Sequence, residues 1–464
     1  MKIALFKKSF SIMKLLAFCL PVVFFVSGCG DSDLFQLVKA ANAQTVPIST
    51  SKDFIRISNV FASNDAVLYS PVGGDKKVAL IYTHPFAATT LVGFFCDQLP
   101  IRGYAVLCFN NRYTNNQQLN TIWEPTALDI ASAVTELRTR GYQKVYLIGY
   151  SAGGPTMAYY QALAEKGNAI FNSGNTLSGF KGFFNADKTA RVFPPSDGLI
   201  FVNPSSGVGA SGMFRLDGSI IDEESGAKDP SLDMYSSANG FDAVKGTGTY
   251  TKTFLQNYYA AQCNRMNKLI DSSQKRLEIV KSGKGRFVDD ELSLIVGLRA
   301  NPAYVDLSLA TTTKGSYLLL PSGEISVVKN ERKLNNYSTR NRGVDEAART
   351  DTSFLSYRAV KCISFNPDAT TKDDHGLDTK SSNNVTYANM ELVNAPTLII
   401  QGNADNTIVH LTIPELIFNS TAAADKSLWF IKGMTHGITA NNSSDGDVPG
   451  VLANSIASWL KTRN

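Results

Sequence analysis

Short apolar runs alternate with amphipathic segments in two separate stretches of the chain. Several runs lack polar alternation, which is typical of strands buried on both faces of a parallel sheet. These runs lie at 77–83, 104–109, 145–148, 198–203, 397–400 and 427–431. Amphipathic patterns of helical period lie between or after them, as at 125–140 and 448–460. The alternation predicts an α/β protein with a mostly parallel sheet and helices on both faces.

Two more segments, 53–60 and 66–69, alternate polar and apolar residues and predict more exposed strands, which makes an expected sheet of eight. The regular pattern stops after residue 205 and resumes at residue 396. We therefore expect a core of 53–205 and 396–464, interrupted by an insertion at 206–395. So long an insertion should carry structure of its own. Its patterns predict helices at 250–268, continuing towards 280, and at 289–298, and a hairpin at 316–328.

The N-terminal residues have the features of an export signal. Residues 1–28 combine four lysines, an apolar run and small residues before Cys29. The ending Val26-Ser27-Gly28-Cys29 resembles the lipobox of bacterial lipoproteins, which implies a lipid anchor on Cys29 and an exported protein of the cell envelope. Secretion after cleavage near Ala43 is the alternative. The apolar run is too short for a transmembrane helix of about 20 residues, and 29–52 is expected to be a tether.

Charge and cysteine usage narrow the classes of function. The net charge of +5 includes four lysines of the leader, which leaves a nearly neutral chain and no case for nucleic-acid binding. The segment 252–286 contains eight basic residues and two acidic ones. Such a charge pattern indicates either a solvated helix face or a contact with a membrane surface or an acidic ligand. Cys263 and Cys362 are a possible disulfide pair. With no C-x-x-C pair and four scattered histidines, we expect no metal site.

One strand ends in a turn that carries a serine. The strand 145–148 leads into Gly149-Tyr150-Ser151-Ala152-Gly153, and a helical pattern follows. So sharp a turn needs a strained backbone at Ser151 and neighbours without bulk, which Gly149 and Gly153 provide. These residues resemble the G-x-S-x-G nucleophile elbow of the α/β-hydrolase superfamily. The resemblance implies that fold, with Ser151 as nucleophile and the insertion as a cap over the site.

In this superfamily an acid and a histidine follow the serine in that order. Asp405 lies in a loop after the strand 397–400, and His436 lies in the last loop between a strand and a helix. The resemblance implies that Asp405 orients His436 and that His436 is the base. The rival candidates for the two positions are Asp217, Asp222, Glu223, His410 and His375.

The loop after strand 77–83 carries His84-Pro85-Phe86 and resembles the His-Gly-aromatic segment that completes the oxyanion hole in the superfamily. This chain has Pro85 where glycine is usual, and proline has no N–H to donate. The expected donors are therefore the N–H groups of Phe86 and Ala152. His84 holds the position that usually supports this loop, with direct acid–base catalysis as the alternative.

The expected activity is hydrolysis of a carboxylic ester through an acyl-enzyme, without metal or organic cofactor. The substrate would be a small or lipid-like ester. A peptidase or amidase of the same fold is the alternative, and a non-catalytic binding lipoprotein is the rival from another class. A halide or epoxide hydrolase is disfavoured because Ser151, rather than an aspartate, occupies the elbow.

Overall fold

The computed structural model describes residues 31–59, 62–114, 125–167, 193–207, 210–211, 215–284, 292–296, 300–334, 344–349 and 385–463. Cys29, the predicted signal, His375 and Cys362 lie outside these residues, so the lipidation site and the Cys263–Cys362 pair stay predictions. Among the described helices, none has both the length and the apolar character needed to span a membrane.

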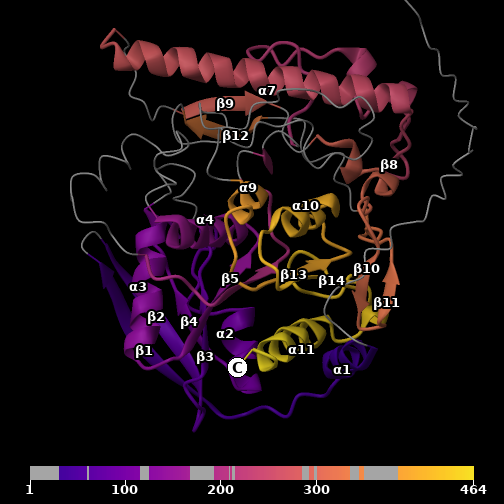
Figure 1. Ribbon diagram of the computed structural model, residues 1–464. Helices are drawn as coiled ribbons and strands as arrows, with labels where there is room; N and C mark the ends of the chain where they lie inside the picture. The colour runs from indigo at the N-terminus through magenta and orange to yellow at the C-terminus, as the bar shows by residue number, and fades with distance from the viewer. Residues whose placement is uncertain are drawn as a thin grey trace, which may run out of the picture.

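A mixed, mostly parallel sheet forms the centre of the described part of the chain (Figure 1). Its order is β1-β2-β4-β3-β5-β6-β13-β14-β10-β11. The pairs β1–β2, β2–β4 and β10–β11 are antiparallel and the others are parallel. The bounds are β1 Thr50–Asn59, β2 Ala62–Pro71, β3 Val78–Tyr82, β4 Ala105–Phe109, β5 Lys144–Tyr150, β6 Gly198–Val202, β10 Tyr317–Leu320, β11 Glu324–Ser326, β13 Thr397–Gly402 and β14 Lys426–Ile431.

The expected count of eight strands was wrong, because the sheet has ten. The two additional strands, β10 and β11, are the hairpin predicted within the insertion. β10 pairs in parallel with β14, from Leu318 opposite Trp429 to Leu320 opposite Ile431. Leu319 and Leu320 are buried, so joining β14 removes apolar surface from water that a free hairpin would expose. Part of the insertion therefore belongs to the core.

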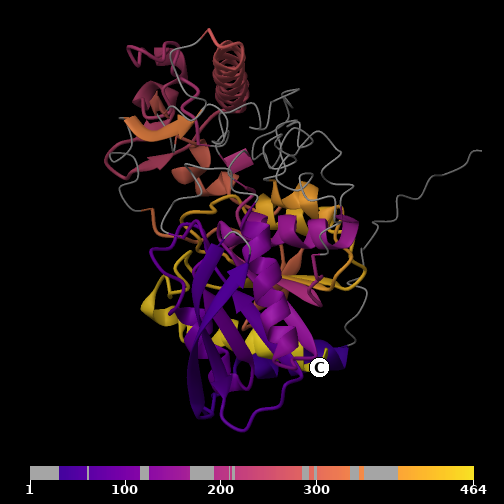
Figure 2. The ribbon, with the colours of Figure 1, turned by 90° about the vertical axis from the view of Figure 1, so that its left-hand side faces the viewer.

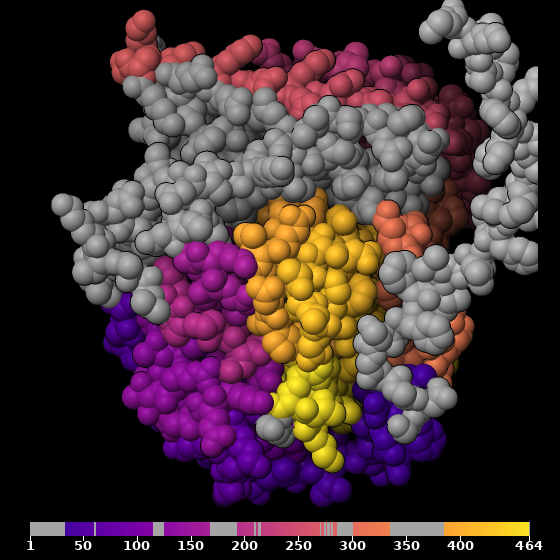
Figure 3. Space-filling view, in the orientation of Figure 1, coloured from indigo at the N-terminus to yellow at the C-terminus, as the bar shows by residue number. Residues whose placement is uncertain are grey.

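Helices cover both faces of the sheet, and each face has its own apolar cluster. One face carries α3 (Thr126–Thr139), α4 (Gly153–Lys166), α9 (Thr386–Met390) and α10 (Thr412–Ser420). The other carries α1 (Asp31–Ala41), α2 (Phe94–Gln98) and α11 (Val448–Lys461). The predicted layering is thus confirmed. Figure 3 shows the C-terminal part of the chain, coloured orange to yellow, as a continuous strip of the surface that faces the viewer.

Residues 29–52, expected to be a tether, contain structure in their described part. α1 packs against α11, with Leu37 and Ala41 buried. Asn42 Nδ2 donates to the carbonyl of Pro321 at 3.1 Å, which ties the end of α1 to the β10–β11 turn. Asn454 Nδ2 also donates to the carbonyl of Ala43 at 2.8 Å. Buried side chains and several hydrogen bonds therefore fix a segment whose sequence shows no clear period.

The insertion has an apolar cluster of its own, built largely from aromatic residues around α7 (Lys252–Lys281). The long predicted helix is therefore confirmed. The helix predicted at 289–298 was wrong: β9 (Leu292–Val296) lies there and pairs with β12 (Val344–Arg349). The described part of the insertion also contains the short hairpin of β7 (Phe241–Asp242) and β8 (Thr247–Gly248). In Figures 1 and 2, α7, β9 and β12 lie together on one side of the molecule, away from the large sheet.

A disulfide that the sequence did not predict joins Cys96 on α2 to Cys108 on β4, with 6.2 Å between the two Cα atoms. Both cysteines are fully buried. The bond fixes α2 to the strand that neighbours β3, and the loop after β3 carries His84 and Phe86.

Candidate functional site

Ser151 has the strained backbone that the elbow predicts, with a φ of 52° in a region that residues with a side chain rarely adopt. Gly149 lies so close to the next strand that an added Cβ would be 2.7 Å from the ring of Phe201. A Cβ on Gly153 would lie 3.3 Å from the carbonyl oxygen of Thr83. The small residues therefore let the turn pack against β6 and against the end of β3.

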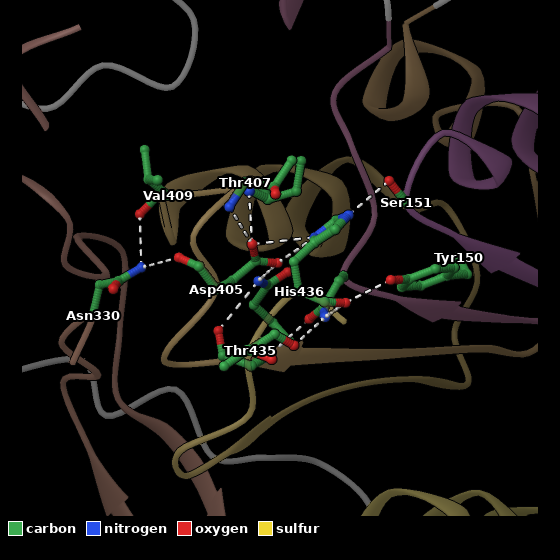
Figure 4. A network of polar contacts seen from close by, with 12 residues as sticks. Tyr150, Ser151, Asn330, Asp405, Thr407, Val409, Thr435 and His436 are labelled. Carbon is green, nitrogen blue, oxygen red and sulfur yellow. Dashed lines mark hydrogen bonds and ion pairs between the residues drawn. The ribbon is translucent and has the colours of Figure 1, made fainter. Parts of the chain in front are cut away.

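The structure brings Ser151, His436 and Asp405 together from three loops (Figure 4). His436 Nε2 lies 2.9 Å from Ser151 Oγ. On the other side of the ring, Nδ1 lies 2.9 Å from Asp405 Oδ2 and 3.1 Å from Oδ1. The Asp405 side chain is fully buried, whereas 16% of the His436 side chain is exposed. The arrangement is able to pass the serine proton to the imidazole and to stabilise the imidazolium that results.

Backbone groups hold the carboxylate of Asp405 in place. Its Oδ1 accepts from the N–H groups of Thr407 at 2.7 Å and Ile408 at 2.8 Å, as in an Asx turn. Its Oδ2 accepts from Gln401 Nε2 at 3.1 Å. These contacts thus fix the orientation of the carboxylate, with both oxygens within 3.1 Å of His436 Nδ1.

Two residues that sequence reasoning missed hold the loop of His436. Tyr150 donates from its hydroxyl to the carbonyl of His436 at 2.6 Å, and its ring stacks on the imidazole. Burial raises the pKa of Tyr150, with the charge of Asp405 adding to the effect, so the hydroxyl remains a donor. Asn203 donates to the carbonyls of Thr435 and His436, both at 3.2 Å, and accepts from the N–H of Gly402. Asn203 directly follows β6, and this position was a signal available in the sequence.

The two predicted oxyanion donors, the N–H groups of Ala152 and Phe86, differ in whether they already donate a hydrogen bond. The N–H of Ala152 has no hydrogen-bond partner among the described residues and lies where α4 begins. The N–H of Phe86 donates to His84 Nδ1 at 3.1 Å. Burial, and then the electrostatic effect of the neighbouring His436, lowers the pKa of His84 to about 4, so His84 is neutral at pH 7 and accepts this bond. His84 therefore contacts the expected donor rather than the serine.

The rival acids form contacts elsewhere. Asp217 pairs with Lys228 at 2.7 Å, and Glu223 forms two contacts with Arg265. Asp222 caps a turn through Ser225. His410 is buried, and burial lowers its pKa to about 4, so it is a neutral residue of the core. Within the described ranges, no group of three or more His, Cys, Asp or Glu side chains could hold a metal ion.

No protein-family model matches the chain, and no curated protein matches it. Solved structures similar to it include the esterase domain of a Rhodothermus marinus protein, with 12% identity, 88% of this chain and 98% of that chain covered, and a TM-score of 0.37. A soluble variant of the Saccharomyces cerevisiae monoglyceride lipase shares 12% identity over 91% of this chain and 98% of that chain, with a TM-score of 0.39. Brefeldin A esterase, described as a bacterial homologue of human hormone-sensitive lipase, shares 12% sequence identity over 93% of this chain and 84% of that chain, with a TM-score of 0.36. At TM-scores this low, we base no conclusion about activity on these proteins.

Proposed function

We propose that this chain is a serine hydrolase of the α/β-hydrolase fold that cleaves carboxylic esters through an acyl-enzyme. The observation that carries the proposal is the pair of 2.9 Å contacts that His436 makes with Ser151 and with Asp405. A serine hydroxyl needs a base to become a nucleophile, and the base needs an acid to hold it. The order Ser, Asp, His along the chain and the elbow before α4 are typical of this fold.

In the proposed mechanism, His436 takes the proton of Ser151 while Oγ attacks the ester carbonyl. The oxygen that becomes negative accepts hydrogen bonds from the N–H of Ala152 and the N–H of Phe86. The N–H of Phe86 must first give up its hydrogen bond to His84 Nδ1. His436 then gives its proton to the leaving alcohol, and an acyl-serine remains. A water molecule that loses a proton to His436 attacks the acyl-serine. His436 then returns that proton to Oγ as the bond between Oγ and the acyl carbon breaks, which releases the acid and restores Ser151.

A fluorophosphonate probe, which labels activated serines, tests the nucleophile. We expect labelling of the wild type and none of Ser151→Ala, and equal labelling of both would refute the proposal. A panel of p-nitrophenyl esters beside aminoacyl anilides separates an esterase from a peptidase or amidase. A non-catalytic binding lipoprotein would turn over neither set, and turnover that is lost in His436→Ala would exclude it.

The substrate is proposed to be a small or lipid-like ester, with the insertion 206–395 acting as a cap over Ser151. We also propose export and lipidation at Cys29. The buried Cys96–Cys108 disulfide supports export, because such bonds are typical of oxidising compartments. Incorporation of a labelled fatty acid that Cys29→Ala abolishes would test the anchor, and secretion without lipid would favour cleavage near Ala43.

A further inference from the structure

A segment of the insertion, residues 328–333, runs between the loop of Asp405 and the loop of His436; we call it the bridging segment. The N–H of Glu331 donates to the carbonyl of Asn403 at 2.7 Å, in the acid loop. The carbonyl of Glu331 accepts from Asn441 Nδ2 at 3.0 Å, in the histidine loop. The bridging segment thus connects the two loops whose relative position sets the Asp405–His436 contact.

Asn330 is the buried centre of the bridging segment, with 3% of its surface exposed. Its Nδ2 donates to the carbonyl of Asp405 at 3.0 Å and to the carbonyl of Val409 at 3.2 Å (Figure 4). A side-chain amide has two N–H hydrogens, so this one group satisfies the first and the last carbonyl of the turn 405–409. Its Oδ1 accepts from the N–H of Arg332 at 3.1 Å, which fixes the orientation of the amide.

The turn that Asn330 closes is the one that aims the carboxylate. The N–H groups of Thr407 and Ile408, which hold Asp405 Oδ1, lie inside this turn. The side chain of Val409, at its end, packs in the apolar cluster of the insertion. The acid turn is therefore held from the insertion at both its backbone and its last side chain.

We propose that Asn330 is a positioning residue of the Ser151–His436–Asp405 site. By closing the acid turn it keeps the carboxylate aimed at His436, so a segment outside the predicted core is required for full catalytic rate. This inference rests on the proposed hydrolase function. It assigns the insertion a part in catalysis that is separate from any role in covering the substrate.

The test is Asn330→Asp, which keeps the shape of the side chain and the acceptor for Arg332 but places an acceptor against two carbonyl oxygens. We expect kcat to fall about 100-fold, as small misplacements of catalytic groups do. KM should stay within about twofold, because Asn330 acts through Asp405 and not on the substrate. Partial unfolding would also lower the apparent kcat at unchanged KM, so kcat is expressed per folded enzyme, with the folded fraction taken from the urea denaturation curve of each variant.

Thr312→Val is the matched control. Thr312 is buried, and its Oγ1 accepts from the N–H of Val328 at 3.0 Å, so the variant loses a hydrogen bond to the same segment but none to the acid turn. We expect a lower Tm with kcat within about twofold of wild type. An equal fall of kcat in Thr312→Val would overturn the inference, because general loosening of the segment would then explain the effect.

Fluorophosphonate labelling of the wild type separates the two levels of the argument. If the wild type is not labelled, the proposed function fails and the inference fails with it. If the wild type is labelled and Asn330→Asp keeps the wild-type kcat, only the inference is overturned. If Asn330→Asp does not fold, Asn330→Ser replaces it, because serine is uncharged and has a single, shorter donor. A lower kcat at unchanged KM in this variant supports the inference, and an unchanged kcat overturns it.

Discussion

Replacing Asp405 with asparagine would test whether its carboxylate sets the tautomer of His436. The N–H groups of Thr407 and Ile408 donate to Oδ1, so the carbonyl oxygen of an asparagine should stay at that position. The new amide nitrogen then replaces Oδ2, which lies 2.9 Å from His436 Nδ1. A ring that kept its proton on Nδ1 would have only the 3.1 Å contact to Oδ1 and would face the new donor. Two donors cannot share the shorter contact, so we expect Nδ1 to accept and the ring proton to move to Nε2. In that tautomer His436 cannot take the proton of Ser151.

We expect the effect to be large on rate and small on stability. Exchanging the acid of a Ser-His-Asp triad for asparagine lowers kcat about 10⁴-fold, which corresponds to roughly 5 kcal/mol of barrier. The two backbone hydrogen bonds to Oδ1 survive the change. Gln401 Oε1 is buried without a partner among the described residues, and a rotation of that side-chain amide would let it accept from the new donor. The unfolding free energy should therefore change by only about 1 kcal/mol.

The assay is steady-state kcat on an ester that the wild type hydrolyses, together with urea denaturation. Asp217→Asn is the control, because Asp217 is also a buried aspartate but pairs with Lys228 in the insertion. It should lose stability and keep its kcat. An Asp405→Asn variant within tenfold of the wild-type kcat, or a larger rate loss in Asp217→Asn, would refute the assignment of the acid.

Three further predictions concern the surroundings of the site. Burial is the main cause that lowers the pKa of His84 from 6.5 to about 4. The stabilisation that depends on neutral His84 is therefore complete above pH 6.5 and is lost as the pH falls towards 4. The total loss of unfolding free energy is about 3 kcal/mol. His84→Asn should flatten this part of the curve of unfolding free energy against pH, and an unchanged curve would contradict the prediction. Replacing Cys96 and Cys108 by alanine opens a loop with a sequence separation of 12 and should lower the unfolding free energy, measured by urea denaturation, by about 3 kcal/mol. A loss below about 1 kcal/mol would contradict this prediction. Gly149→Ala should lower the unfolding free energy by about 2 kcal/mol, because the added Cβ would lie 2.7 Å from Phe201. Gly153→Ala should lower it by less, because its Cβ would lie 3.3 Å from Thr83. Equal Tm values for the two variants would show that the closer approach at Gly149 is unimportant.

The core and the elbow could be predicted because their signals are local. The run 145–148 is apolar without alternation, and β5 is buried on both faces. The requirement for a strained serine between small residues follows from the turn alone, and Ser151 has the expected positive φ. The loops of Asp405 and His436 follow apolar strands, and the structure brings the two side chains together. Their catalytic roles stay predictions.

The errors arise where the outcome depends on contacts between distant segments. The apolar residues Leu318–Leu320 fit any buried strand, and nothing local indicates that they extend the main sheet beside β14. The run Leu292–Val296 is short enough to fit a helix or a strand, and pairing with β12 decides between them. Asn203 and Asn330 belong to no motif, since a buried amide is recognised only from the carbonyls around it.

The position of the insertion in the sheet also bears on how the chain folds as it is synthesised. β6 pairs with β13, with Val202 opposite Ile400, although the whole insertion separates them in sequence. Every residue of the insertion must therefore be synthesised, and in an exported protein also translocated, before β13 can cover the free edge of β6. The entropy cost of closing so long a loop grows only with the logarithm of its length, but the delay leaves a central, apolar strand edge open to wrong pairing. We expect wrong pairing of the incompletely folded chain to begin at this edge.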